Sequence, residues 1–355
     1  MNPLEVLLLV VAFLVILSGA ELFTNGIEWF GRKLELAEGA VGSVLAAVGT
    51  ALPETMIPIV AILSNPHGSN VAVGAILGAP FMLSTLAMFV TGAAVLAVAR
   101  RRPAGDVMPV DPAVLSKDAR TFGAAYAIAV AAAFLPPELG WLKPVVGVGL
   151  LGVYALYVKS HLDADATIGD DDVLAPLRLH RLDRAARRRE PAVPRLRIVS
   201  VQVVVALGLI IGGAVLFVDA VEGLGRELGV NETLLALVIA PIATELPEKL
   251  NSVIWVRQGK DTLALGNITG AMVFQSTIPT VVALVLAGAT WTVASGTMLA
   301  FASAAIAFLS TAAIFVPMAR SGVLRGRRLL VGGAFYLVYL GLVVADLAGV
   351  VSFEG

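Results

Sequence analysis

The sequence predicts an all-α integral membrane protein, with about ten transmembrane helices arranged as two inverted five-helix repeats. Three observations predict this fold class: the composition, a series of apolar runs, and an internal repeat. The 355-residue chain is 58% hydrophobic and only 14% charged, with a mean hydropathy of +0.90. Soluble domains carry about 25% charged residues, so most of this chain is expected to contact lipid.

Apolar runs of the length that crosses a bilayer recur along the chain, separated by polar connections. The first run lacks the basic flank of a cleaved signal peptide and is interpreted as a helix that stays in the protein. The run 121–135 is short for a span of about 20 residues. The expected spans are 4–23, 40–63, 71–99, 121–135, 141–158, 198–218, 233–256, 262–288, 293–318 and 329–350.

Basic residues concentrate in alternate connections, which predicts that both termini lie outside the cell. The connection 159–197 is long and polar, acidic first and basic second, and is interpreted as a solvated cytoplasmic linker. Its aspartates do not have the spacing of a calcium-binding EF-hand loop. The expected organisation is a first repeat over 1–158, the linker over 159–197 and a second repeat over 198–355.

The internal repeat is visible without a gap, because residues 22–54 align with 216–248 at a constant offset. The aligned segments end in GTALPE and ATELPE. With a shift of two residues the similarity continues from 74–81 onto 266–273. About five spans in each half make the second half enter the membrane from the opposite side. Such inverted repeats bind substrate near the bilayer midplane, on interrupted helices.

Each motif places a proline and a glutamate, Glu54 or Glu248, inside an apolar run. A carboxylate at the bilayer centre costs about 2.5–3.5 kcal/mol, so intramembrane carboxylates are usually functional. The prolines remove helical hydrogen bonds and disfavour helical geometry at Leu52 and Leu246, where unwound kinks are expected. Carboxylate oxygens and freed carbonyls suit a hard cation such as Ca²⁺, which takes six to eight oxygen ligands.

At these residues the chain resembles the cation/calcium antiporter superfamily, the sodium/calcium exchangers and their proton-coupled relatives. In that family each repeat carries G-T-S-x-P-E on one helix and G-N-x-x-G-S-N on the next. The resemblance implies that Glu54 and Glu248 coordinate Ca²⁺ and that Thr50 and Thr244 line the ion sites. Asn267 keeps a family asparagine. The sequence departs from the family pattern at Ala51, Ala75, Ala79, Leu83, Glu245, Ala271 and Gln275.

Glu245 adds a third carboxylate, and three carboxylates carry more negative charge than one Ca²⁺ neutralises. We therefore expect Glu245 or Glu248 to hold a proton during part of the transport cycle. The missing hydroxyl and amide side chains point the same way, toward proton coupling or an altered ion. Asn267 and Gln275 are candidate ligands or interhelical hydrogen-bond partners. The glycine pairs of the repeat, Gly74 with Gly78 and Gly266 with Gly270, are expected to allow close helix packing.

The function expected is secondary active antiport, with Ca²⁺ exchanged for Na⁺ or H⁺. The alternatives are a monovalent cation (Na⁺ or K⁺)/H⁺ antiporter on the same fold and a non-transporting membrane scaffold. An intramembrane enzyme is disfavoured, because there is no cysteine or H-E-x-x-H motif and His67, His161 and His180 are expected in loops.

The expected partners are inorganic cations and the lipid bilayer. No cofactor is expected beyond the transported Ca²⁺, Na⁺ or H⁺. The net charge of −1 gives no reason to expect nucleic acid. A monomer is sufficient, and the oligomeric state is left open.

Overall fold

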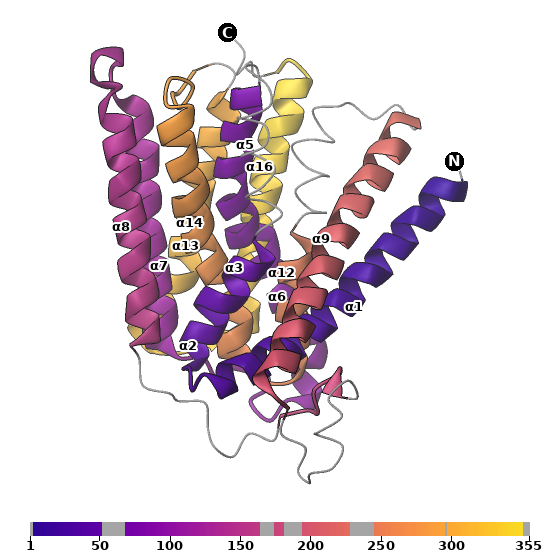
Figure 1. Cartoon of the computed structure of the whole chain (residues 1–355). Coiled ribbons are helices and arrows are strands. Elements are labelled where there is room, and N and C mark those ends of the chain that lie inside the picture. The colour runs from indigo at the N-terminus through magenta and orange to yellow at the C-terminus, as the bar shows by residue number, and fades with distance from the viewer. Residues whose placement is uncertain are drawn as a thin grey trace.

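The computed structural model describes residues 3–51, 68–163, 174–180, 194–227, 245–294 and 297–350. Apart from the two-residue antiparallel strands β1 (Val107–Met108) and β2 (Leu324–Arg325), the regular structure in these residues is helical (Figure 1). The first half contains α1 (Pro3–Lys33), α2 (Glu38–Ala40), η1 (Val41–Ala46), α3 (Ala47–Thr50), α5 (Gly68–Met82), η2 (Leu83–Ala87), α6 (Met88–Val98), η3 (Ala99–Arg101), α7 (Pro112–Ala131), η4 (Ala132–Phe134), η5 (Pro137–Leu139) and α8 (Leu142–Leu162). The second half contains α9 (Leu196–Glu227), α12 (Leu246–Arg257), α13 (Asp261–Leu286), α14 (Met298–Ser321), α15 (Gly326–Leu329) and α16 (Val331–Leu347).

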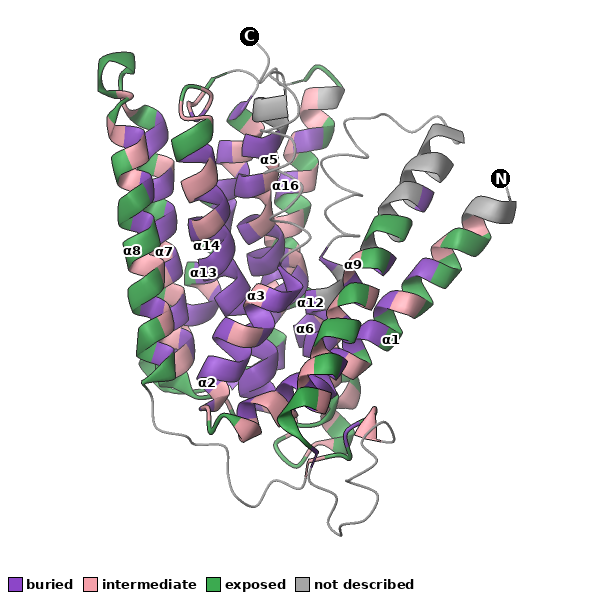
Figure 2. Cartoon of the chain, viewed as in Figure 1, coloured by how far each residue is buried: buried purple, intermediate pink, exposed green. Residues whose placement is uncertain are grey.

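The helices expose apolar side chains on the outside of the bundle, as a protein in a bilayer does. On α8, Val148 and Leu156 are 65% and 70% exposed, and Figure 2 shows that the buried residues gather in the middle of the bundle. Among the described residues, seven segments are long and apolar enough to cross a membrane: Val6–Lys33, Ala72–Arg101, Leu142–Leu162, Leu196–Gly213, Asp261–Leu286, Met298–Ser321 and Gly326–Asp346. The predicted fold class is therefore confirmed.

Helix α7 is longer than the apolar run 121–135 predicts. It has 20 residues, and the side chain of Asp111 caps its first turn by accepting a hydrogen bond from the amide of Ala113 at 2.8 Å. The capping aspartate followed by Pro112 is a typical helix start. Lys117 and Arg120, expected in a polar connection, lie inside this helix. The short run was therefore only the apolar part of a full-length helix.

Equivalent helices of the two halves run in opposite directions. Figure 1 shows α1 descending to the end of the bundle at which α9 begins, and α5 descending toward the end at which α13 begins. Because the chain order within the two halves is the same, the halves enter the bundle from opposite sides. The helices α1 and α9 pack along one another at one edge of the bundle.

Each motif segment contains or adjoins residues outside regular α-helical geometry. In the first half, the π-helical turns of η1 lead into α3, which ends at Thr50. In the second half, Leu246 is the first residue of α12, and the non-helical residue is Glu245, with φ −89° and ψ 8°. Leu246, expected in an unwound kink, is therefore helical, and the non-helical residue described here is Glu245. Pro247 is accommodated in the first helical turn, where its missing N–H is not needed. Leu52 lies outside the described residues.

Helix α13 is the most buried long helix of the bundle, and it contacts η1, α3, α5, α7, α8 and α12. Two of its glycines make this possible. A Cβ atom on Gly270 would clash with the carbonyl oxygen of Ser43 in η1, and one on Gly266 would lie 2.9 Å from the Ser43 hydroxyl. The packing role expected of these two glycines is confirmed. Their counterparts Gly74 and Gly78 meet no described atom within 4 Å.

Polar contacts join the two halves at the end of the bundle where α1 finishes. Glu28 of α1 accepts a hydrogen bond from the Trp255 indole at 2.8 Å and forms an ion pair with Lys260. Arg102, which follows η3, forms an ion pair with Asp261 at the start of α13. These contacts are buried or partly buried, so they fix the ends of α12 and α13 against the first half.

Part of the long linker is hydrogen-bonded to the bundle. The carbonyl of Ala175 accepts a hydrogen bond from the Trp29 indole at 2.9 Å. The amide of Leu179 donates to Gln202 of α9 at 2.8 Å. The side chain of Gln202 in turn donates to Asn25 of α1 at 2.9 Å. Residues 174–180 therefore bridge α1 and α9, a contact that the expectation of a solvated linker did not include, while Ala175, Pro176 and Arg178 are exposed.

Candidate functional site

The side chain of Glu248 is fully buried in the first turn of α12. Neither of its carboxylate oxygens has a hydrogen-bond partner among the described residues. Nine residues separate Glu248 from Arg257 at the helix end, a rise of roughly 14 Å. That is about half of the roughly 30 Å hydrocarbon core of a bilayer. An unpartnered carboxylate at this depth needs a cation or a proton close to it.

Glu248 is joined to both neighbouring helices of the site by a short polar chain. The amide nitrogen of Asn267 on α13 donates to the main-chain carbonyl of Glu248 at 3.4 Å. The hydroxyl of Thr50 on α3 donates to the Asn267 side-chain oxygen at 3.3 Å, or to the carbonyl of Ala46 at 3.1 Å. All three side chains are fully buried. The structure thus brings Thr50, Asn267 and Glu248 together from three separate elements.

Asn251 belongs beside Glu248, although the motif comparison did not single it out. It is fully buried one helical turn further along α12, and neither polar atom of its side chain has a partner among the described residues. Residues three apart lie on the same face of a helix. Two carboxylate oxygens and one amide oxygen are therefore available on one turn of α12. A polar residue inside the apolar run 233–256 was the signal in the sequence.

Glu245 is not a free third carboxylate, because Lys249 pairs with it. The Lys249 ammonium lies 3.1 Å from a Glu245 carboxylate oxygen and 3.3 Å from the Glu245 main-chain carbonyl. Both residues are buried, Glu245 at 1% and Lys249 at 4% exposure. The expectation of a protonated Glu245 or Glu248 rested on three carboxylates without a positive side chain. The structure supplies that positive charge, and the sequence signal was a lysine within an apolar run.

Gln275 lies apart from this group on α13. It is buried, with both side-chain polar atoms unpartnered among the described residues. Eight residues separate it from Asn267, a rise of roughly 12 Å along the helix, so the two do not belong to one coordination sphere. Glu54 and Thr244 lie outside the described residues. Of the three expected carboxylates, Glu245 and Glu248 belong to the described residues. Within the described part of the chain, no three acidic or histidine side chains form a metal cluster.

Several positions at which the chain departs from the motif pattern are filled by hydrocarbon. Ala51, Leu83 and Ala271 are fully buried. Leu83 begins the π-helical segment η2, and π-helical turns occur frequently at functional sites. Because these side chains offer no oxygen, the candidate oxygen donors among the described residues lie on α12 and in the Thr50–Asn267 pair.

A second buried polar group braces the helices that carry these residues. Asp118 of α7 is fully buried and accepts four hydrogen bonds. The donors are the side chains of Ser43 at 2.7 Å, Thr269 at 2.6 Å, Tyr157 at 3.0 Å and His161 at 3.0 Å. They come from η1, α13 and α8, so Asp118 holds four elements together. His161 is buried in α8, which corrects its expected place in a loop.

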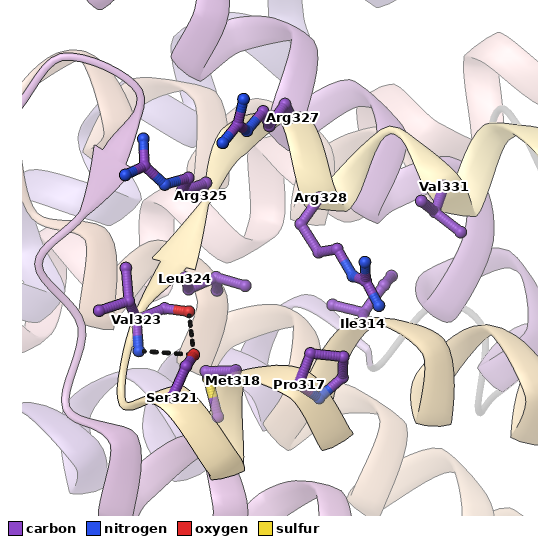
Figure 3. A pocket seen from close by; sticks show the side chains of 10 residues that line it. All are labelled: Ile314, Pro317, Met318, Ser321, Val323, Leu324, Arg325, Arg327, Arg328 and Val331. Atoms are coloured by element: carbon purple, nitrogen blue, oxygen red, sulfur yellow. Dashed lines mark hydrogen bonds between the residues drawn. The ribbon is translucent and has the colours of Figure 1, made fainter.

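A cavity of about 590 Å³ lies elsewhere, between the end of α14 and the start of α16 (Figure 3). Arg325, Arg327 and Arg328 line it together with Ser321 and apolar side chains, and no carboxylate of the described residues lines it. The Arg328 guanidinium donates to the carbonyl of Ala313 at 2.9 Å. Pro317 cannot satisfy that carbonyl four residues earlier in α14, because it has no N–H. A cavity lined by arginines is unsuited to cations, so it is not the candidate site.

Comparison with known proteins identifies the family. The sequence profile described as "Sodium/calcium exchanger protein" matches residues 4–159 and 198–347, which together are most of the chain. The chain belongs to the sodium/calcium exchanger protein family. The unmatched stretch between these two regions falls within the expected linker. The resemblance stated on the GTALPE and ATELPE motifs is thereby confirmed.

Individual relatives within and around this family are distant. "Putative antiporter CaxA" of Alkalimonas amylolytica is 24% identical over 273 residues, covering 74% of this chain and 75% of that protein. "Uncharacterized membrane protein MJ0091" of Methanocaldococcus jannaschii is 34% identical over 76 residues, covering 19% of this chain and 25% of that protein. Both are consistent with a membrane protein of the exchanger family.

Solved structures of the sodium-calcium exchanger NCX_Mj share the fold. The form soaked with 2.5 mM Na⁺ and 0.1 mM Ca²⁺ superposes with a TM-score of 0.70 at 16% identity, covering 96% of this chain and 99% of that one. The form soaked without Na⁺ and Ca²⁺ gives a TM-score of 0.68 over the same coverage. The whole exchanger fold is therefore present in this chain.

Proposed function

We propose that this protein is a secondary active antiporter that exchanges Ca²⁺ for Na⁺ or H⁺ at a buried site built from Glu54 and Glu248. The observation that carries the proposal is the Glu248 side chain, fully buried with both oxygens unpartnered among the described residues. An isolated carboxylate of this kind is costly unless a cation or proton neutralises it. A site that must always hold one or the other is suited to exchange.

The ligands of the site are hard oxygen donors. Glu248 contributes its carboxylate, and Asn251 contributes an amide oxygen that no described residue uses. Thr50 and Asn267 offer oxygens from α3 and α13, close to the Glu248 backbone. Glu54 enters from the first repeat, as the inverted symmetry and the motif imply. Carboxylate, amide and hydroxyl oxygens in flexible geometry match the ligand preference of Ca²⁺.

Alternating access follows from the inverted repeats. In this proposal the repeats 1–158 and 198–355 form the two sides of the site, and relative movement of the helices opens it to one side of the membrane at a time. The arginine-rich connections share the end of the bundle at which α1 finishes, the end that the positive-inside rule assigns to the cytoplasm. Both termini and the start of α5 then face the outside. A single chain contains all the parts of this cycle.

A monovalent cation (Na⁺ or K⁺)/H⁺ antiporter on the same fold is the second candidate. The observation in its favour is the buried hydrocarbon at Ala51, Leu83 and Ala271, since the exchanger family carries polar side chains there. Fewer oxygen ligands favour ions of lower charge. Glu248 remains the central ligand in both candidates, so the two differ in the ion and not in the site.

The test is ion flux in proteoliposomes that contain the purified protein. Uptake of radioactive Ca²⁺ driven by an outward Na⁺ gradient or an outward H⁺ gradient is expected, and Glu248→Gln is expected to abolish it. Glu138→Gln is the matched control, because Glu138 is exposed near the membrane surface. Absence of Ca²⁺ flux together with Na⁺-dependent or K⁺-dependent proton movement would replace the calcium proposal by the monovalent one. Absence of all of these fluxes would leave a non-transporting scaffold.

A further inference from the structure

Lys249 is the basic side chain next to the candidate ion site, and it is 4% exposed in the middle of the apolar run that carries Glu248. Its ammonium donates to the carboxylate and to the main-chain carbonyl of Glu245, at 3.1 and 3.3 Å. Charged side chains at this depth in a membrane are rare, and they mark ion pathways or the groups that balance them. A pair of apolar side chains would fill the same space at lower cost.

The pair is confined to the second repeat. Ala51 and Thr55 stand at the equivalent positions of the first repeat, so neither half of the pair has a symmetric copy. A device needed only to hold the fold would be expected to follow the symmetry of the fold. A group that adjusts the charge of one shared ion site needs to be present only once.

The charge balance of the site suggests what the lysine does. When both carboxylates are ionised, Glu245 and Glu248 carry two negative charges against the one positive charge of Lys249, which lies 3.1 Å from Glu245, so the described part of the site then has a net charge of −1. Glu54 would bring the net charge to −2, which one divalent or two monovalent cations would balance. Without Lys249 the same carboxylates would carry −3 and would require one more monovalent cation.

We propose that Lys249 is a tethered cation, which occupies at Glu245 the place of one monovalent ion that the protein would otherwise bind and move. This inference rests on the proposed antiport function and names the residue that sets its ion count. The ammonium remains with the chain, whereas a bound Na⁺ would travel with the cycle. Lys249 therefore lowers by one the number of monovalent charges exchanged in each turnover.

The first test compares wild type, Lys249→Met and the double variant Glu245→Ser/Lys249→Met in proteoliposomes at a fixed pH and fixed Na⁺ gradient. The equilibrium Ca²⁺ accumulation is measured at several membrane potentials set with K⁺ and valinomycin. Each net charge moved changes the accumulation ratio by about 50-fold per 100 mV. In Lys249→Met, the potential dependence of the accumulation ratio is expected to differ from that of wild type by one factor of about 50 per 100 mV. The double variant is expected to return to the wild-type dependence. Lys159→Met, an exposed lysine at the end of α8, is the matched control.

The same potential dependence in wild type and Lys249→Met would overturn the proposal. If Lys249→Met fails to fold, Glu245→Ser provides the test, because it leaves the ammonium unpaired beside Glu248. We expect this variant to bind Ca²⁺ at least roughly tenfold more weakly than wild type, and addition of Lys249→Met to restore binding. Equal affinities in the single and double variants would contradict a charge-balancing role.

Failure of the antiport proposal itself is recognised separately. Wild type would then show no Ca²⁺ flux under any gradient. The tethered cation is still testable in that case by counting radioactive Na⁺ bound at saturation to the purified protein at pH 8. Lys249→Met is expected to bind one more Na⁺ than wild type, and an equal count would sink the inference.

Discussion

The buried hydrogen bonds to Asp118 should contribute strongly to the stability of the protein. Replacement of Asp118 by alanine removes an acceptor that four side chains use. Thr269 retains the carbonyl of Leu265 at 3.0 Å, and Tyr157 retains the carbonyl of Ser43 at 3.2 Å. Among the described residues, the Ser43 hydroxyl and the His161 ring nitrogen that faces Asp118 form no other hydrogen bond. The variant therefore leaves two buried groups without partners.

A hydrogen bond to a charged group contributes about 1.5–3 kcal/mol, and each buried donor left unsatisfied costs about 1–3 kcal/mol. We expect Asp118→Ala to lose about 3–5 kcal/mol of stability and to melt roughly 5–15 °C lower in detergent. The stabilisation that Ca²⁺ gives should also fall, because the cluster braces η1 and α13. These elements lead to Thr50 and carry Asn267.

The measurement is thermal unfolding of the purified protein, with and without Ca²⁺. Asp163→Asn is the control, because Asp163 is exposed at the end of α8 and its substitution tests general effects of lost acidic charge. A melting temperature of Asp118→Ala within about 2 °C of wild type would refute the reasoning, since the four hydrogen bonds would then contribute little.

Three further variants test other parts of the account. Gly270→Val should lower the melting temperature sharply, because its Cβ would clash with Ser43, whereas Gly152→Val, at a position with no atom within 4 Å, should not. Equal effects would refute close packing as the role of Gly270. Gln202→Ala should increase hydrogen exchange over residues 174–180, measured by mass spectrometry; unchanged protection would show that this segment does not depend on α9. Asn251→Leu should leave stability without cations unchanged or higher, since its amide has no described partner, and should reduce Ca²⁺-induced stabilisation. Full Ca²⁺ stabilisation of this variant would remove Asn251 from the ligand set.

Much of the fold was predictable from the sequence, because a bilayer constrains sequence strongly. Apolar runs mark spans, and the aligned segments 22–54 and 216–248 imply inversion through an odd number of spans. The Pro–Glu motifs located Glu248 at the point where α12 begins. Leu246 was expected to be unwound but is helical, because the sequence does not distinguish a proline inside a helix from one in its first turn.

The features that were not predicted are of two kinds. The Asp118 cluster depends on contacts between residues far apart in the chain, and the positive charge of Lys249 lies outside the family motif. The donors to Asp118 lie 39 to 151 residues away in the chain, and the run 121–135 left Asp118 in an expected connection. Lys249 was visible, since glutamate and lysine four apart commonly pair on a helix. The family motif ends at Glu248, one residue before Lys249. The family resemblance therefore indicated the candidate site, whereas the pairing of Lys249 with Glu245 and the buried Asp118 cluster are seen in the structure.

The central claim is that Glu248 binds the transported cation, and equilibrium binding of radioactive Ca²⁺ to the purified protein tests it most directly. Wild type and the exposed control Glu138→Gln should bind Ca²⁺ saturably, with competition by Na⁺ or by protons. Glu248→Gln should keep its fold, judged by size-exclusion profile and melting temperature without Ca²⁺, and should lose the saturable binding. Unchanged Ca²⁺ binding in a folded Glu248→Gln protein would contradict the account.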